Sequence, residues 1–179
     1  AQLEKAMKGQ DIVYANLGGQ NDVDLEAEAV IEAMKNANVK RLIWISTLGI
    51  YDEVPGKFGE WNKKTLGDYI TEYAKAVKRI EDSGLNYTII RPTWMTNKDE
   101  VDYEKSKKGE PITDTEVSRK SVAAYVYHLI KKPKEDVKES RENLAIARVR
   151  EKMGRCGSEE PLRWATQLLK DEQELLDMQ

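Results

Sequence analysis

Short apolar runs alternate with longer amphipathic stretches along most of the chain. Three runs rich in β-branched residues, 11–17, 41–46 and 87–92, have the length and composition of strands covered on both faces. Between them, apolar residues recur every three or four positions, which predicts helices over 22–34 and about 65–82. Because strands and helices alternate at these spacings, the pattern predicts right-handed crossovers and a parallel sheet.

Weaker signals extend this pattern. Residues 1–9 read as the last turns of a helix, and Ser118 is a suitable N-cap for a further helix. Residues 144–147 are consistent with a last short strand, whereas the polar, Lys-rich stretch 97–109 predicts a loop. In 148–179 the leucines are spaced for one face of a helix, which predicts a C-terminal helical extension packed on the same domain.

Composition and charge argue against several classes of partner. The 179 residues are 40% hydrophobic and 34% charged, with a net charge of −3 and both signs interleaved. Nucleic acid and anionic membranes demand a concentrated positive face, so neither is expected as a partner. No apolar run approaches the roughly 18 residues of a membrane span, and no signal peptide opens the chain, which predicts a cytoplasmic protein. The single cysteine, Cys156, excludes an internal disulfide, and the acidic residues show no metal-loop spacing.

The carboxyl ends of the predicted strands are where function is expected, because ligands of parallel α/β sheets bind there. These ends are the loops after Leu17, Ser46 and Arg91. Gly18 and Gly19 would let the backbone approach a ligand closely, although a plain turn explains them equally well.

Four segments of the chain share a pattern with one known family. They are Gly9–Gly18, Lys40–Tyr51, Ser83–Pro92 and Val117–Ala123. In this order and spacing they resemble the atypical short-chain dehydrogenase/reductase proteins, in particular the NAD(P)-binding, NmrA-like group. The resemblance covers residues 1–147 and implies an α/β, Rossmann-like parallel sheet with helices on both faces that holds NAD or NADP.

Two features depart from the family pattern. Family members begin with a strand and a Gly-rich turn whose N–H groups hold the pyrophosphate, and this sequence contains no such motif. We therefore expect 1–147 to be a partial Rossmann domain, truncated at its N-terminus by three strands. The stretch 148–179 also differs from the family's short ending. The choice between NAD and NADP stays open. In the family it is made by residues that follow the second strand of the domain, which we expect to be absent from this sequence.

The resemblance also implies candidate catalytic residues. In short-chain reductases a Tyr four residues before a Lys donates a proton, the Lys lowers the pKa of the Tyr and binds ribose, and a strand-end Ser polarises the substrate. Ser46 matches the Ser position, and Lys75 falls near the Lys position. The residue four positions before Lys75 is Thr71, and neither Tyr69 nor Tyr73 has a Lys four positions later. The standard dyad is therefore missing.

These candidates also have simpler explanations. Ser46 faces the cofactor or substrate, or it is a strand-end hydroxyl satisfied by backbone. Lys75 binds ribose, or it lies on a solvated helix face. The single histidine, His128, is interpreted as structural or exposed, which argues against Ser–His–Asp hydrolysis. The predicted cofactor-binding set comprises the strand-end residues and the helix lysine: Asn16, Leu17, Gly18, Gly19, Ser46, Thr47, Lys75, Arg91, Pro92, Thr93 and Trp94.

Three functional hypotheses follow from these observations. The first is an NAD(P)H-dependent oxidoreductase that acts on a small organic acceptor such as a quinone, a flavin or a carbonyl compound. The second is a non-catalytic dinucleotide-binding redox sensor, which the missing Tyr favours. The third is a scaffold fragment that has lost cofactor binding, which the missing Gly-rich turn favours. The expected partners are a nicotinamide dinucleotide and a small-molecule acceptor, with the protein a monomer or a homodimer.

Overall fold

The computed structural model describes residues 2–18, 22–112, 114–131 and 141–148. Gly19 and the predicted C-terminal helix lie outside the described residues. The elements follow in the order α1 (Gln2–Met7), β1 (Ile12–Ala15), α2 (Val23–Asn36), β2 (Arg41–Ile45), α3 (Gly56–Asp82), β3 (Asn86–Pro92), β4 (Trp94–Thr96), β5 (Glu104–Lys107), β6 (Glu116–Ser118), α4 (Arg119–Lys131) and β7 (Glu142–Ala147). None of the described helices is long and apolar enough to cross a membrane.

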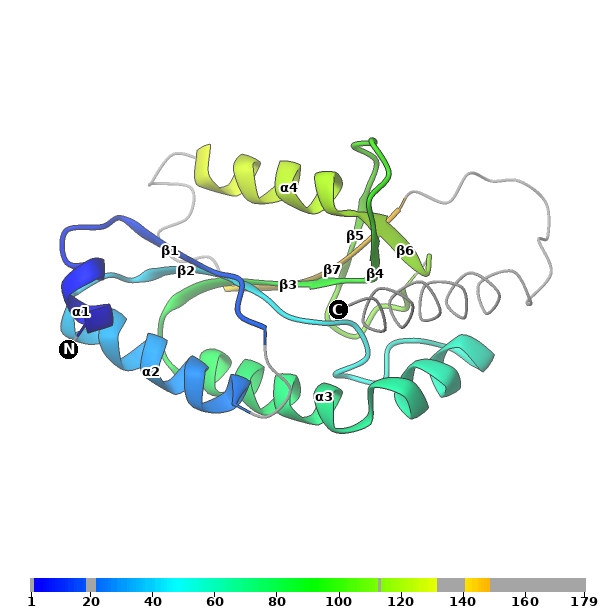
Figure 1. Cartoon of the computed structure of the whole chain (residues 1–179), viewed down its shortest axis with the longest axis horizontal. Helices are drawn as coiled ribbons and strands as arrows, with labels where there is room; N and C mark the ends of the chain where they lie inside the picture. Colours follow the sequence, from blue (N-terminus) through cyan, green and yellow to red (C-terminus); the bar gives the residue numbers. More distant parts are fainter. Residues whose placement is uncertain (1, 19–21, 113, 132–140, 149–179) are drawn as a thin grey trace, which may run out of the picture.

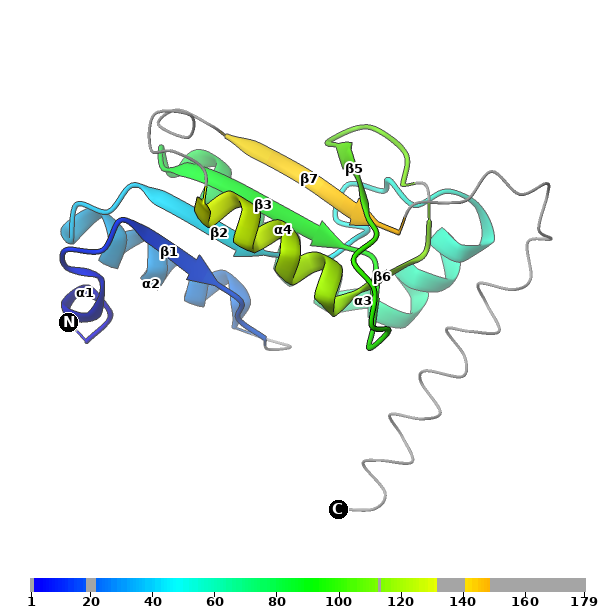
Figure 2. The ribbon, with the colours of Figure 1, turned by 90° about the horizontal axis from the view of Figure 1, so that it is seen from above.

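The main sheet has the strand order β1-β2-β3-β7-β5 (Figure 2). The first four strands are parallel, which confirms the predicted α/β fold, and β5 pairs antiparallel with β7. The prediction of a loop over 97–109 is wrong for β5, whose sequence is polar because only Ser106 of this edge strand is buried. The small parallel sheet of β4 and β6 was not predicted either, since three-residue strands carry no periodicity.

Helices cover both faces of the sheet, as predicted: α2 and α3 lie on one face and α4 on the other (Figure 1). Side chains alternate accordingly along β2, where Leu42 and Trp44 belong to the core under α2 and α3, and Ile43 and Ile45 to the core under α4. The strand thus has the continuous apolar run that two covered faces require.

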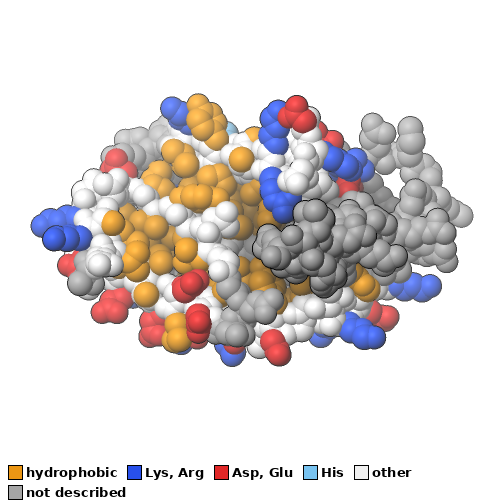
Figure 3. Space-filling view, viewed as in Figure 1, with side chains coloured by type: hydrophobic (Ala, Val, Ile, Leu, Met, Phe, Trp, Pro, Cys, Tyr) orange, Lys and Arg blue, Asp and Glu red, His pale blue; other side chains and the backbone are white. Residues whose placement is uncertain are grey.

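The first strand departs from its prediction. Tyr14 of β1 is 47% exposed, so the expectation of burial on both faces is wrong there. Among the described residues β1 pairs only with β2, which leaves it at an edge of the sheet. Hydrophobic side chains gather on the side of the molecule that carries this edge (Figure 3).

Helix α3 begins earlier than its predicted start near Thr65. It runs from Gly56 and is kinked at Gly67, which has φ 36° and ψ −112°. The two glycines at its start suggested a loop, but Phe58 and Trp61 pack against an apolar cluster, and this tertiary packing outweighs the low helix propensity of glycine. The kink divides α3 into a first half that meets β4 through Trp61 and a second half that packs on the sheet.

Helix α4 begins as the sequence predicts. The Ser118 hydroxyl accepts the backbone N–H of Ser121 at 2.9 Å, which is the bond expected of an N-cap. This cap fixes the helix start directly after β6.

Candidate functional site

The strand registers bring three carboxyl ends together. Ala15 of β1 lies opposite Trp44, and Ile45 of β2 lies opposite Ile90. Ser46 continues this ladder by donating its backbone N–H to the Ile90 carbonyl at 2.7 Å. The residues that follow β1 and β2 therefore border one edge of the sheet, where the sequence predicted a ligand. We call residues 46–53 the strand-end loop.

Ser46 is the predicted residue whose environment most favours a ligand. Its side chain is only 6% exposed, yet its hydroxyl has no hydrogen-bond partner within the described part of the chain. Continuing the alternation of Leu42 and Trp44, it points to the α3 side of the sheet. A buried hydroxyl without a partner costs stability. The explanation that backbone satisfies this hydroxyl therefore does not hold, and the group is free to bond a ligand atom.

Helix α3 presents tyrosines to these strand ends. The Tyr73 hydroxyl donates to the Leu17 carbonyl at 2.9 Å, and the Tyr69 ring lies 4.5 Å from the Tyr73 ring, centre to centre. Burial, and then the hydrogen bond with Tyr69, raise the pKa of Tyr73, so the phenol stays neutral. The sequence carried one signal for this pair, since Tyr69 and Tyr73 are four residues apart on a helix and therefore share a face.

Lys75 lies elsewhere on α3. It follows the buried Tyr73 by two residues, which turns it about 200° around the helix axis. Its side chain is 56% exposed and forms an ion pair with Glu72 at 2.6 Å. The hydrogen bond with Glu72 raises the pKa of Lys75, which keeps the ammonium charged. The structure therefore brings Tyr73, and not Lys75, against the loop after β1.

The predicted residues from the end of β3 to the start of β4 are three buried residues and one partly exposed tryptophan. Arg91 and Pro92 are buried in the strand, and Thr93 donates its backbone N–H to the Ile146 carbonyl at 3.0 Å. Trp94 is half-buried, lies 5.1 Å from Trp61 between ring centres, and donates its indole N–H to Asn62 at 2.9 Å. Trp94 thus carries the only partly exposed side chain of these four residues.

The remaining predicted residues line the loops themselves. Asn16 and Gly18 are exposed, Leu17 is half-buried, and Thr47 is buried at 8% exposure. A Cβ atom at Gly18 would meet no atom within 4 Å, so the space beside this backbone is open. Such space fits a ligand group that approaches the loop after β1, although it does not require one.

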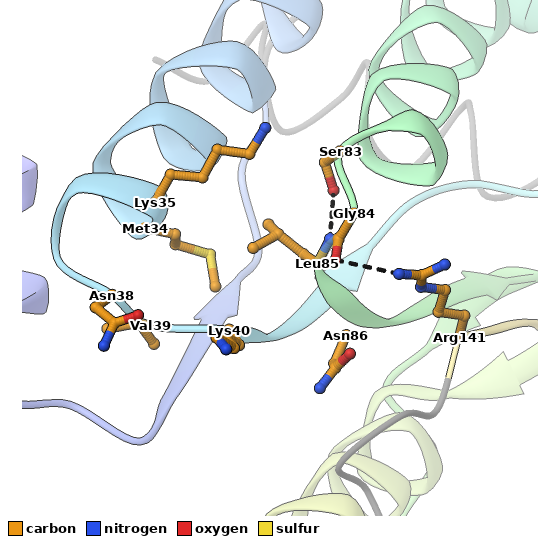
Figure 4. Close-up of a pocket in the computed structure, with 10 residues that line it drawn as sticks. All are labelled: Met34, Lys35, Asn38, Val39, Lys40, Ser83, Gly84, Leu85, Asn86 and Arg141. Atoms are coloured by element: carbon orange, nitrogen blue, oxygen red, sulfur yellow. Dashed lines mark hydrogen bonds between the residues drawn. The ribbon is translucent and has the colours of Figure 1, made fainter.

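A cavity of about 700 Å³ lies at the opposite edge of the sheet (Figure 4). It is bordered by the ends of α2 and α3 and the amino ends of β2 and β3, with Lys35, Lys40 and Arg141 in its lining. Ser83 donates to the Ile80 carbonyl and so caps the end of α3, and Arg141 donates to the Gly84 carbonyl just beyond this end. Ligands of parallel sheets bind at the other edge, and we therefore place the candidate site there.

No cluster of three or more His, Cys, Asp or Glu side chains suited to a metal ion occurs among the described residues. Ser46, the Tyr69–Tyr73 pair and the open loop after β1 instead offer neutral hydroxyl and backbone groups. These groups can form hydrogen bonds with an uncharged ligand that carries hydroxyl or amide groups, whereas no described turn is Gly-rich enough to hold a pyrophosphate.

Comparison with known proteins gives consistent results. A family model described as NAD(P)H-binding matches residues 1–133. The "Uncharacterized sugar epimerase YhfK" of Bacillus subtilis (strain 168) is 34% identical over 105 residues, which are 54% of this chain and 46% of that protein. The match thus spans about half the length of this curated relative.

Solved structures show the same fold. A Rossmann-fold NAD(P)-binding family protein from Shigella flexneri is 42% identical, with a TM-score of 0.66 over 87% of this chain and 68% of that one. A short-chain dehydrogenase/reductase from Veillonella parvula DSM 2008, solved in complex with NADP, is 26% identical, with a TM-score of 0.73 over 82% of this chain and 66% of that one. The resemblance to short-chain dehydrogenase/reductase proteins is thereby confirmed.

Proposed function

The chain belongs to the NAD(P)H-binding family, and from this premise we propose that it is an NAD(P)H-dependent oxidoreductase acting on a small organic acceptor, such as a quinone, a flavin or a carbonyl compound. The observation that carries the proposal is the buried, unpartnered hydroxyl of Ser46 at the carboxyl end of β2. The similarity to a reductase solved with NADP supports the cofactor class.

Each residue of the site has a distinct part in this proposal. When bound, the nicotinamide ring supplies or accepts a hydride. Ser46 donates its hydroxyl proton in a hydrogen bond to the acceptor or to the carboxamide, and the backbone of Asn16–Gly18 borders the nucleotide. Trp94 and Trp61 form an apolar wall that excludes water from this end of the sheet. Tyr73 holds the loop after β1 through the Leu17 carbonyl.

The first experiment is titration of the purified chain with NADPH and then NADH, followed by tryptophan fluorescence and an acceptor screen. We expect saturable binding and turnover with at least one quinone, flavin or carbonyl acceptor. Ser46→Ala should lower kcat by about 100-fold, as loss of an oriented donor does in other enzymes. Its free energy of unfolding should not fall, because the deleted hydroxyl has no described partner.

Ser118→Ala is the matched control, since the Ser118 hydroxyl bonds the Ser121 N–H and caps α4. This variant should lose about 1 kcal/mol of stability and keep its kcat. Unchanged turnover in Ser46→Ala would remove Ser46 from the mechanism.

A second candidate function is a dinucleotide-binding redox sensor without catalysis. It is favoured by one observation, the ion pair that holds Lys75 beside Glu72, so that no Tyr–Lys dyad is assembled. Cofactor binding without turnover of any acceptor would support this alternative. Absence of binding by the folded chain would instead support a scaffold that has lost the cofactor.

The cytoplasmic location, the monomeric or homodimeric state and the packing of the C-terminal extension stay predictions of the sequence.

A further inference from the structure

A buried ion pair fixes the strand-end loop to strand β3 of the sheet. Glu53, the last residue of this loop, pairs with Arg91 of β3, and the two side chains are 1% and 0% exposed. The Glu53 carboxylate also accepts the backbone N–H of Gly49 at 3.1 Å and that of Tyr51 at 2.9 Å. One carboxylate therefore closes the turn and joins it to the sheet.

Arg91 extends the contact to a third strand. Its Nε donates to the Asn143 side chain of β7 at 2.8 Å, and its guanidinium carbon lies 5.1 Å from the centre of the Tyr51 ring. Asn143 in turn donates to the Tyr51 hydroxyl at 2.7 Å. Glu53 and Tyr51 of the loop are thus both fixed to side chains of the sheet.

The outer side of the loop is held by α3. Gly49 has a φ of +90°, and a Cβ atom there would come within 2.9 Å of Asn62 Nδ2. Asn62 is 1% exposed and accepts the indole N–H of Trp94, so it cannot move away without breaking that bond. The strand-end loop is consequently held on both sides.

Stability alone does not explain this arrangement. A buried ion pair pays a large desolvation cost, and well-packed apolar residues often replace such a pair without loss of stability. A buried pair that shapes a loop through two backbone N–H groups, however, fixes geometry, and functional groups need such a supporting shell of residues. The nearer residue held by this pair, Gly49, lies two positions after Thr47.

We propose that Glu53 is a positioning residue, which together with Arg91 holds the strand-end loop in the shape that presents Ser46 and Thr47 to the nicotinamide nucleotide. This inference rests on the proposed oxidoreductase function and deepens it. Arg91, which the sequence placed in the cofactor-binding set, then acts through Glu53 from its buried position.

The test compares Glu53→Gln with the wild type by amide hydrogen exchange and by kinetics. Gln keeps the size of Glu53 but loses the charge and one acceptor, so the N–H groups of Gly49 and Tyr51 should exchange at least about 10-fold faster. Because a small misplacement of a reacting group is costly, kcat should fall by about 10-fold to 100-fold while the acceptor KM changes less.

Asp24→Asn is the matched control. It removes a partly exposed carboxylate that pairs with Arg79 between α2 and α3, and this carboxylate bonds none of the described residues 46–53. This variant should leave the exchange of Gly49 and Tyr51 and the kcat at wild-type values, which separates positioning from a general loss of stability.

If Glu53→Gln does not fold, Arg91→Lys provides the second variant. Lys keeps the charge opposite Glu53 but loses the planar fork that also reaches Asn143, so faster loop exchange and a smaller fall in kcat are expected. Wild-type exchange and kcat in either folded variant would overturn the inference while leaving the proposed function intact. If the wild type itself neither binds nor turns over cofactor, the proposed function fails, and the exchange rates alone decide whether Glu53 holds the loop.

Discussion

At the scale of single residues, the hydroxyl of Tyr73 joins α3 to the loop after β1. Its bond to the Leu17 carbonyl spans 56 positions of the chain and is partly buried. Tyr73→Phe deletes this bond and leaves the ring in place, so the variant should lose about 1 kcal/mol of stability. It should also weaken binding of NADPH or NADH severalfold, because the loop that we propose to border the nucleotide is no longer held. Urea unfolding and fluorescence titration measure the two effects.

Lys75→Ala is the informative comparison for Tyr73→Phe. Lys75 is exposed and pairs with Glu72 within one turn of α3, so its removal should change the free energy of unfolding by less than about 0.5 kcal/mol. We expect cofactor affinity to fall less than in Tyr73→Phe. A larger loss in Lys75→Ala would instead support the sequence-based hypothesis that this lysine binds ribose.

The strand-end serine was predictable, but three residues that support the surrounding loops were not. Ser46 follows a β-branched run, and such runs mark strand ends in sequence. Tyr73, Glu53 and Asn62 act through contacts that cross 32 or more positions, to Leu17, Arg91 and Trp94. No local spacing encodes these contacts, since they exist only after the strands and helices have packed.

At the scale of elements, α2 and α3 pack side by side under the sheet and are joined by charges. Arg79 of α3 bonds the Asp24 carboxylate of α2, with Nη2 at 2.9 Å from Oδ2, and also approaches Glu28 at 3.4 Å. The hydrogen bond from Arg79 lowers the pKa of Asp24, which outweighs the opposing effect of burial. This interaction stabilises the fold only while Asp24 is ionised.

The sign of the pH dependence follows from the lowered pKa of Asp24. The stabilisation is fully present above the unfolded value of about 3.9 and is lost as pH falls through the lower folded value. Asp24→Asn should therefore be less stable than the wild type at pH 7, and the difference should shrink towards pH 2. Urea unfolding at several pH values tests this, with Asp52→Asn as the control because Asp52 forms an exposed ion pair with Lys63. A difference that is constant with pH would contradict the assignment.

Elements were predictable where their own periodicity is strong. The apolar face of α2 and the β-branched run of β3 identify them within one or two residues of their observed bounds. The first half of α3 was missed because glycines mark its start and its stability comes from Phe58 and Trp61 in a distant cluster. Strand β5 was missed because an edge strand needs few apolar residues.

At the scale of the whole molecule, one sheet separates two apolar cores. Neighbouring residues of β3 belong to different cores: Ile89 lies under α2 and α3, Ile90 lies under α4, and both are 0% exposed. Because β3 has paired strands on both sides, a loss of packing on either face is transmitted to the same hydrogen-bonded ladder. The described chain should therefore behave as one cooperative unit, although its cores share few side chains.

This cooperativity gives a prediction for two adjacent substitutions. Ile89→Ala and Ile90→Ala should each cost about 2–5 kcal/mol, because each leaves a cavity in a closed core. If the sheet couples the cores, both variants should unfold in one transition with the wild-type m-value, as measured by urea titration of fluorescence and far-UV circular dichroism together. Tyr127→Ala, on the exposed side of α4, should change stability by no more than about 0.5 kcal/mol. If fluorescence and far-UV circular dichroism give separate transitions in Ile90→Ala alone, helix α4 unfolds independently of the rest of the domain. The strand-end site would then depend only on the core under α2 and α3.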